Sequence, residues 1–213
     1  MPAAAVTTEH PGARRSLAAV AAVWIVALIA SGIAPRDRLT WFMEVLPVLI
    51  ALPLLAATRA RFPFTTLAYA LIAAHGLILI LGGAYTYAHV PAGFWVQEWL
   101  GLERNPYDRL GHLAQGFVPA IVAREILIRV FRLAPGRFLF FVTTCICLAI
   151  SAFYELIEWW SALALGQGAH EFLGTQGDEW DTQWDMFLAL VGACTAQWLL
   201  ARVHDRQLAP LRG

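Results

Sequence analysis

The sequence contains no lysine, only three cysteines and only four serines, and each shortage excludes a class of chemistry. Because all fifteen cationic side chains are arginine, Schiff-base enzymes and P-loop phosphate sites, which need a lysine amine, are excluded. The cysteines lie in apolar runs without the paired spacing of a metal or disulfide framework, so we expect them to be core residues. The GxSxG, HExxH and GxGxxG motifs of hydrolases, zinc peptidases and dinucleotide-binding proteins are also absent.

Charge is scarce as well. Charged residues make up 14% of the 213 residues and hydrophobic residues 59%, against about 25% and 45–50% in an average soluble domain. The formal net charge is zero and no basic stripe stands apart from the ends of the apolar runs, so nucleic acid is excluded as a partner. This composition indicates a membrane protein whose main partner is the lipid bilayer.

Six apolar runs are long enough to cross a membrane as helices, since a crossing needs about 20 residues. They cover residues 17–34, 40–58, 65–89, 111–129, 138–163 and 185–203. We therefore predict an all-α, polytopic membrane bundle of about six transmembrane helices, with one transmembrane domain at 16–204. Residues 1–15 are expected to be a disordered cytoplasmic tail and 205–213 a short cytoplasmic tail. Residues 91–102 are expected to form an amphipathic segment on the outer surface.

The arginines predict the orientation, because Lys and Arg in short loops are retained on the cytoplasmic side. With the amino terminus inside, the inner segments hold ten arginines and the outer segments four. Seven of the nine tryptophans then fall at outer helix ends or in outer loops, where an indole is half apolar and half hydrated. Both termini are accordingly predicted to be cytoplasmic.

Polar residues recur on one face of three predicted helices, near their outer ends. The three stripes are Asp108, His112 and Gln115; Ser151, Glu155 and Glu158; and Asp178, Asp181 and Asp185. Side chains at such spacings are neighbours on a helix, about 5–6 Å apart. Glu44 lies one turn inside the second run, and His75 lies near the middle of the third. Ionisable groups are costly in lipid, so this convergence predicts a functional site facing outward.

Carboxylates with one or two histidines are the ligands of hard and borderline divalent cations. One hypothesis is therefore a metal-dependent enzyme that acts on an envelope, periplasmic or lipid-linked substrate, with a divalent metal ion as cofactor. It assigns His112, Glu155, Asp181 and Asp185 as metal ligands, Glu158 as general base and Arg109 as the stabiliser of developing negative charge.

Two other classes of function remain open. A transporter for an ion or small solute would use the same polar residues, with Glu44 and His75 extending the site towards the middle of the membrane. A structural or assembly protein would use the acids only to pair with Arg109 and to cap helices, with Asp181 as an N-cap. In the same structural interpretation, His75 donates a hydrogen bond between helices, and Glu125 pairs with Arg129 one turn away.

Three segments carry a resemblance to a known family. They are YDRLGHLAQGFVPAIVAREI at 107–126, FYELIEWW at 153–160 and FLGTQGDEWDTQWDMFLALVGA at 172–193. These segments resemble the YjdF-type family of predicted bacterial inner-membrane proteins, over about residues 41–201. The resemblance implies an integral protein of the bacterial inner membrane with no established activity, so it assigns no catalytic residue.

Overall fold

The computed structural model describes residues 11–165 and 176–211, and all regular elements among them are helices. They are α1 (Pro11–Ile33), α2 (Arg38–Thr58), α3 (Thr66–Tyr85), α4 (Pro91–Leu100), α5 (Tyr107–Arg129), α6 (Arg137–Leu165), α8 (Asp181–Leu208) and a short 3-10 helix, η2 (Ala209–Leu211). Of the tail predicted at 1–15, residues 1–10 lie outside the described residues, and α1 begins at Pro11.

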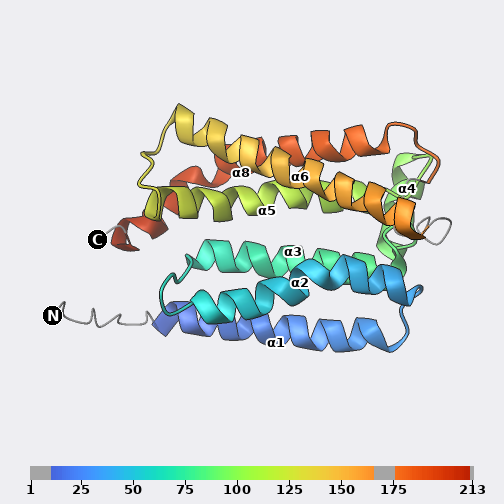
Figure 1. Cartoon of the computed structure of the whole chain (residues 1–213), viewed down its shortest axis with the longest axis horizontal. Coiled ribbons are helices and arrows are strands. Elements are labelled where there is room, and N and C mark those ends of the chain that lie inside the picture. Colours follow the sequence, from blue (N-terminus) through green and yellow to red (C-terminus); the bar gives the residue numbers. More distant parts are fainter. Residues whose placement is uncertain (1–10, 166–175, 212–213) are drawn as a thin grey trace.

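Five of these helices, α1, α2, α3, α6 and α8, are long and apolar enough to cross a membrane, which confirms a polytopic helical bundle. The remaining predicted span, 111–129, falls within α5. This helix is 23 residues long and lies alongside the others in Figure 1. By composition α5 does not qualify, because charged residues stand near both of its ends. Thirteen of its residues are buried, so α5 faces protein more than lipid.

The long helices form two halves, with α1, α2 and α3 in one and α5, α6 and α8 in the other (Figure 1). In one half, α3 packs on both α1 and α2; in the other, α5, α6 and α8 pack on one another. The halves meet mainly where α3 lies against α5. In Figure 1, α1 begins and α8 ends at the same end of the bundle, here called the terminus end, and α4 lies at the opposite, α4 end.

Helix boundaries differ from the predicted runs where local capping overrides the apolar pattern. The side chain of Thr65 caps α3, and α3 ends at Tyr85 because Thr86 has a left-handed backbone with φ of 57°. His89, predicted as the end of this span, therefore follows the helix in a turn. Helices α5 and α8 each begin four residues earlier than predicted, so Asp108 and Asp181 lie in their first turns.

Small residues let α5 and α8 approach closely. A Cβ atom added to Gly116 would overlap the carbonyl of Ala189, and one added to Gly192 would overlap the carbonyl of Leu113. Such contacts fix the relative height of two membrane helices, because neither can slide without steric overlap. They hold the α4-end turns of α5 and α8 side by side.

The tryptophans predicted at the outer boundary all lie towards the α4 end. Trp95 and Trp99 of α4 are 73% and 81% exposed. The tryptophans near the end of α6, Trp159 and Trp160, and at the start of α8, Trp180 and Trp184, are exposed too. Trp24 is different, because it is buried between α1 and α3 and donates a hydrogen bond to the carbonyl of Ala73.

Candidate functional site

Four acidic side chains surround His112 near the α4 end. Helix α5 contributes Asp108 along with His112, α8 contributes Asp185, and α6 contributes Glu155 and Glu158. The side chains form two groups that share the imidazole: Asp108, His112 and Asp185, and His112, Glu155 and Glu158. Within each group, one ligand atom from every residue lies within 4.8 Å of the others.

The two nitrogens of His112 face different acids. Nε2 lies 3.6 Å from Oδ1 of Asp108 and 3.7 Å from Oδ2 of Asp185. Nδ1 lies 3.2 Å from Oε1 of Gln115 and 3.9 Å from Oε1 of Glu155. The imidazole therefore lies between carboxylates from three helices, at distances longer than ordinary hydrogen bonds to those carboxylates.

Burial and incomplete hydrogen bonding set this cluster apart. Asp185 is 2% exposed and Glu155 8%. Oδ1 of Asp185 and Oε1 of Glu155 have no hydrogen-bond partner within the described part of the chain. Buried carboxylate oxygens are normally paired, so these two atoms are positioned to accept a ligand.

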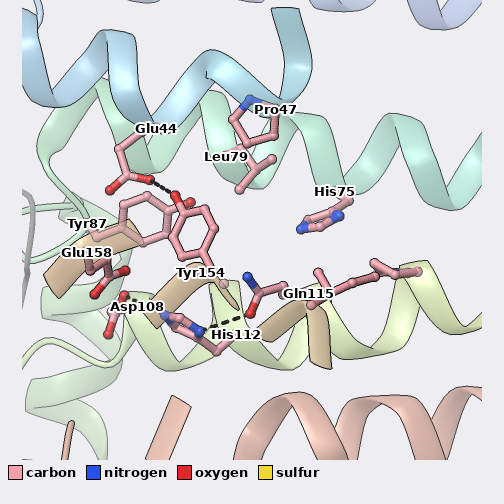
Figure 2. A pocket seen from close by; sticks show the side chains of 13 residues that line it. Glu44, Pro47, His75, Leu79, Tyr87, Asp108, His112, Gln115, Tyr154 and Glu158 are labelled. Atoms are coloured by element: carbon pink, nitrogen blue, oxygen red, sulfur yellow. Dashed lines mark hydrogen bonds and ion pairs between the residues drawn. The ribbon is translucent and has the colours of Figure 1, made fainter. Parts of the chain in front are cut away.

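A cavity of about 300 Å³, here called the His112 cavity, adjoins the cluster between α2, α3, α5 and α6 (Figure 2). Glu44, Asp108, His112 and Glu158 line it towards the α4 end, and His75 lines it deeper in the bundle. Nε2 of His75 is buried and has no hydrogen-bond partner among the described residues. The cavity thus joins an acid-rich end to a polar group inside the bundle.

Tyr154 connects the two halves across this cavity. Its hydroxyl donates a hydrogen bond of 3.3 Å to Oε2 of Glu44 on α2, and its ring packs edge-on against His112, with 6.5 Å between centroids. Figure 2 shows the ring between Glu44 and His112. Sequence reasoning missed this residue, although it directly precedes Glu155.

A second polar cluster covers the site at the α4 end. The guanidinium of Arg104, just before α5, pairs with Asp181 and with Asp108 at 3.3 Å, and lies 3.4 Å from Asp178. Burial alone would lower the pKa of Arg104, but its hydrogen bond to Asp181 and the negative charge of Asp181 and Asp108 raise the pKa above its ordinary value. Arg104 is therefore a fixed positive charge at the edge of the acids.

Asp178 and Arg109 belong to this covering cluster. Asp178 accepts a hydrogen bond from the backbone N–H of Trp180, and this bond, together with Arg104 and Arg109, holds the pKa of Asp178 below its ordinary value. Arg109 lies 3.2 Å from Asp178 and 5.3 Å from the ring centroid of Trp184. Its partner is thus Asp178 rather than Glu155 or Glu158.

Of the four predicted metal ligands, three lie in the groups around His112 and one does not. His112, Glu155 and Asp185 converge, Asp108 and Glu158 join them, and Gln115 contacts the imidazole. Asp181 pairs with Arg104 and belongs to neither group around His112. Nor does Asp181 cap α8, because the N-cap position is Trp180 and has no side-chain hydrogen bond.

The terminus end holds a different polar network, centred on the fully buried Glu125. Its carboxylate accepts hydrogen bonds from Arg129 at 2.7 Å and from the backbone and hydroxyl of Thr65. His204 lies 3.0 Å away through Nε2, while its Nδ1 contacts Arg124 at 3.1 Å. Because a guanidinium only donates, Nδ1 accepts and Nε2–H donates to Glu125. The predicted Glu125–Arg129 pair is confirmed, within a network whose side chains from α5 and α8 pair with one another.

Comparison with known proteins identifies relatives of this chain. A family model described as "Predicted membrane protein (DUF2238)" matches residues 16–206. The chain is 62% identical over 181 residues to inner membrane protein YjdF of Escherichia coli (strain K12), covering 85% of this chain and 87% of that protein. No solved structure matches. The matches confirm the resemblance that the three sequence segments indicated.

Proposed function

The chain belongs to the DUF2238 family of predicted membrane proteins, and from this premise we propose that it binds a divalent cation at the His112 cluster and acts there on an envelope or lipid-linked substrate. The single observation that carries the proposal is the convergence of four acids on one buried histidine, with two carboxylate oxygens that accept no hydrogen bond from the described residues. In this proposal the α4 end faces outward and both termini are cytoplasmic.

Charge balance supports a cation. Asp108, Glu155, Glu158 and Asp185 lie close to one imidazole, and the guanidinium of Arg104 pairs with Asp108 at the edge of this group. Several buried carboxylates need protons, cationic side chains or a metal ion to offset their desolvation. Oxygen ligands with one imidazole suit Mg²⁺, Mn²⁺ or Zn²⁺.

The surrounding residues then have distinct roles. Asp108, His112 and Asp185 would hold the cation, and Gln115 would fix the orientation of the imidazole. Glu158, which lines the His112 cavity, is placed to take a proton from a nucleophile there. A divalent cation would supply Lewis acidity to this chemistry. Arg109 is held by Asp178 and Trp184, so we assign it no direct role.

Elemental analysis of the detergent-purified full chain tests the cation site. We expect near-stoichiometric Mn²⁺ or Zn²⁺ after dialysis with the metal, and its loss in Asp185→Asn. Asp178→Asn is the matched control, because this acid lies at the same end of the bundle but outside both groups around His112. Absence of metal from the wild type, or equal loss in both variants, would contradict the proposal.

Ion transport is the second candidate, and His75 is the observation that favours it. This side chain extends the polar lining of the cavity into the bundle and leaves Nε2 unpaired. Transport predicts uptake of Mn²⁺ by proteoliposomes, abolished in His75→Ala. The enzyme proposal predicts no uptake and unchanged Mn²⁺ binding in that variant.

A further inference from the structure

An apolar groove of about 510 Å³ runs along the terminus half of the boundary between α2 and α5, here called the seam groove. Its lining comes from α2, α3, α5 and the connection between α2 and α3, and includes Leu54, Ile72, Val122 and Val130. Helix α6 contributes nothing to this lining. Figure 1 shows the reason: α6 crosses obliquely over α5, and its terminus-end half lies away from α2.

The groove is open on the lipid-facing side and borders the His112 cavity. Leu54, within the candidate span of α2, is 59% exposed, and Val130, directly after α5, is 55% exposed. Pro119 lines both the seam groove and the His112 cavity, so the two adjoin at this residue. Pro47 and Ile150 form apolar walls of the cavity on the α2 and α6 sides.

This arrangement matches the polarity of one lipid molecule. A lipid in the leaflet at the α4 end has its headgroup near the acids and its chains directed towards the terminus end. The His112 cavity is acidic, so a phosphate would be repelled there unless a cation lies between the phosphate and the carboxylates. The apolar lining of the adjoining seam groove suits a hydrocarbon chain.

We infer that the substrate is a phosphate-bearing membrane lipid, held by its phosphate through the cation at His112 and by one hydrocarbon chain in the seam groove. The inference rests on the proposed cation site and deepens it by naming the substrate class. Entry is sideways, from the bilayer, between α2 and α6, which Tyr154 joins by its hydrogen bond to Glu44.

Photocrosslinking in nanodiscs tests this inference with the full chain. The probe is a phosphatidic acid that carries a diazirine in its acyl chain, at trace level in phosphatidylcholine. A phosphatidylcholine with the same diazirine chain is the reference for ordinary boundary lipid. We expect phosphatidic acid to crosslink preferentially to residues 51–58 and 118–130, and Mn²⁺ to increase this crosslinking.

A second test uses the same crosslinking assay with a substitution that fills the seam groove. Val122→Trp is expected to reduce crosslinking of phosphatidic acid in the groove by about tenfold, the effect of losing roughly two buried methylenes, and to leave Mn²⁺ binding unchanged. Val26→Trp is the matched control, because Val26 is a lipid-facing valine on α1, 68% exposed and outside the groove.

The outcomes separate the two proposals. Equal crosslinking of both lipids, or crosslinks spread over all lipid-facing helices, would identify ordinary boundary lipid and overturn the inference while Mn²⁺ binding stands. Failure of Mn²⁺ to bind the wild type overturns the proposed function, and with it the cation-dependent part of lipid capture. Crosslinking that Val122→Trp leaves unchanged rejects the groove as the chain site.

Discussion

Replacing His112 by alanine removes the one side chain that both ligand groups share. Each group then keeps only two acids within reach of a common ion, and the two groups lose their common member. Loss of even an outer-shell partner of a metal ligand costs about 10–100-fold in affinity. We therefore expect His112→Ala to weaken Mn²⁺ binding by about 100-fold or more, or ~2.7 kcal/mol.

Thermal stability converts this loss into a measurable shift. At a free Mn²⁺ concentration of about 100 times the wild-type Kd, binding stabilises the folded wild type by ~2.7 kcal/mol. At the same concentration, a variant weakened 100-fold gains only ~0.4 kcal/mol. With about 2–4 °C per kcal/mol for a chain of this size, the wild-type Tm rises by roughly 5–11 °C and that of His112→Ala by about 1–2 °C.

The assay is a thermal scan of intrinsic tryptophan fluorescence in detergent, with Mn²⁺ or with EDTA, using the nine native tryptophans. His75→Ala is the control, because His75 lines the same cavity but belongs to neither ligand group. This control should keep the full wild-type shift. Equal Mn²⁺ shifts in wild type and His112→Ala would refute the reasoning, since the cation would then bind elsewhere.

Three further variants test the packing and the two polar clusters. Gly116→Val is expected to lower the unfolding free energy by about 3 kcal/mol, because the valine side chain would overlap the carbonyl of Ala189. A thermal scan measures the loss as a fall in Tm, and an unchanged Tm would refute the close α5–α8 contact. Glu125→Gln should destabilise the protein by about 3 kcal/mol, because it removes the buried carboxylate that pairs with Arg129. The loss is again measured as a fall in Tm, while metal content per folded chain stays constant. Arg104→Gln should tighten Mn²⁺ binding by roughly tenfold, because the substitution removes a positive charge next to the acids. Titration with Mn²⁺ measures the affinity, and weaker binding would show that Arg104 instead holds the ligands in place.

The sequence predicts much of this bundle because apolar runs determine where membrane helices lie. It also predicts most of the acid cluster, since Asp108 and His112 are one turn apart on a helix and their spacing alone makes them neighbours. Glu155 and Asp185 required an additional assumption, that three helix ends meet. The structure supports that assumption through the close contact of α5 with α8.

Other contacts could not be read from spacing. Arg104 lies in a connection without periodicity, so its pairing with Asp181 had no signal in the sequence, and Asp181 was assigned to the cation instead. Glu125 and His204 are 79 residues apart, and only the fold brings them together. Gly116 did offer a signal, since a small residue in a membrane helix is typical of close helix packing.

The polarity of α5 also bears on how the protein is assembled in the membrane. This helix has a polar cluster near each end, with Asp108 and His112 at one and Arg124 and Glu125 at the other. A charged residue near the centre of an isolated membrane helix costs about 2.5–3.5 kcal/mol to insert, and less towards the ends. We therefore expect α5 to enter the bilayer efficiently only together with an apolar neighbour such as α3 or α6. Integration of the nascent chain should then stall or fail when both neighbours are deleted, even though α5 itself is intact.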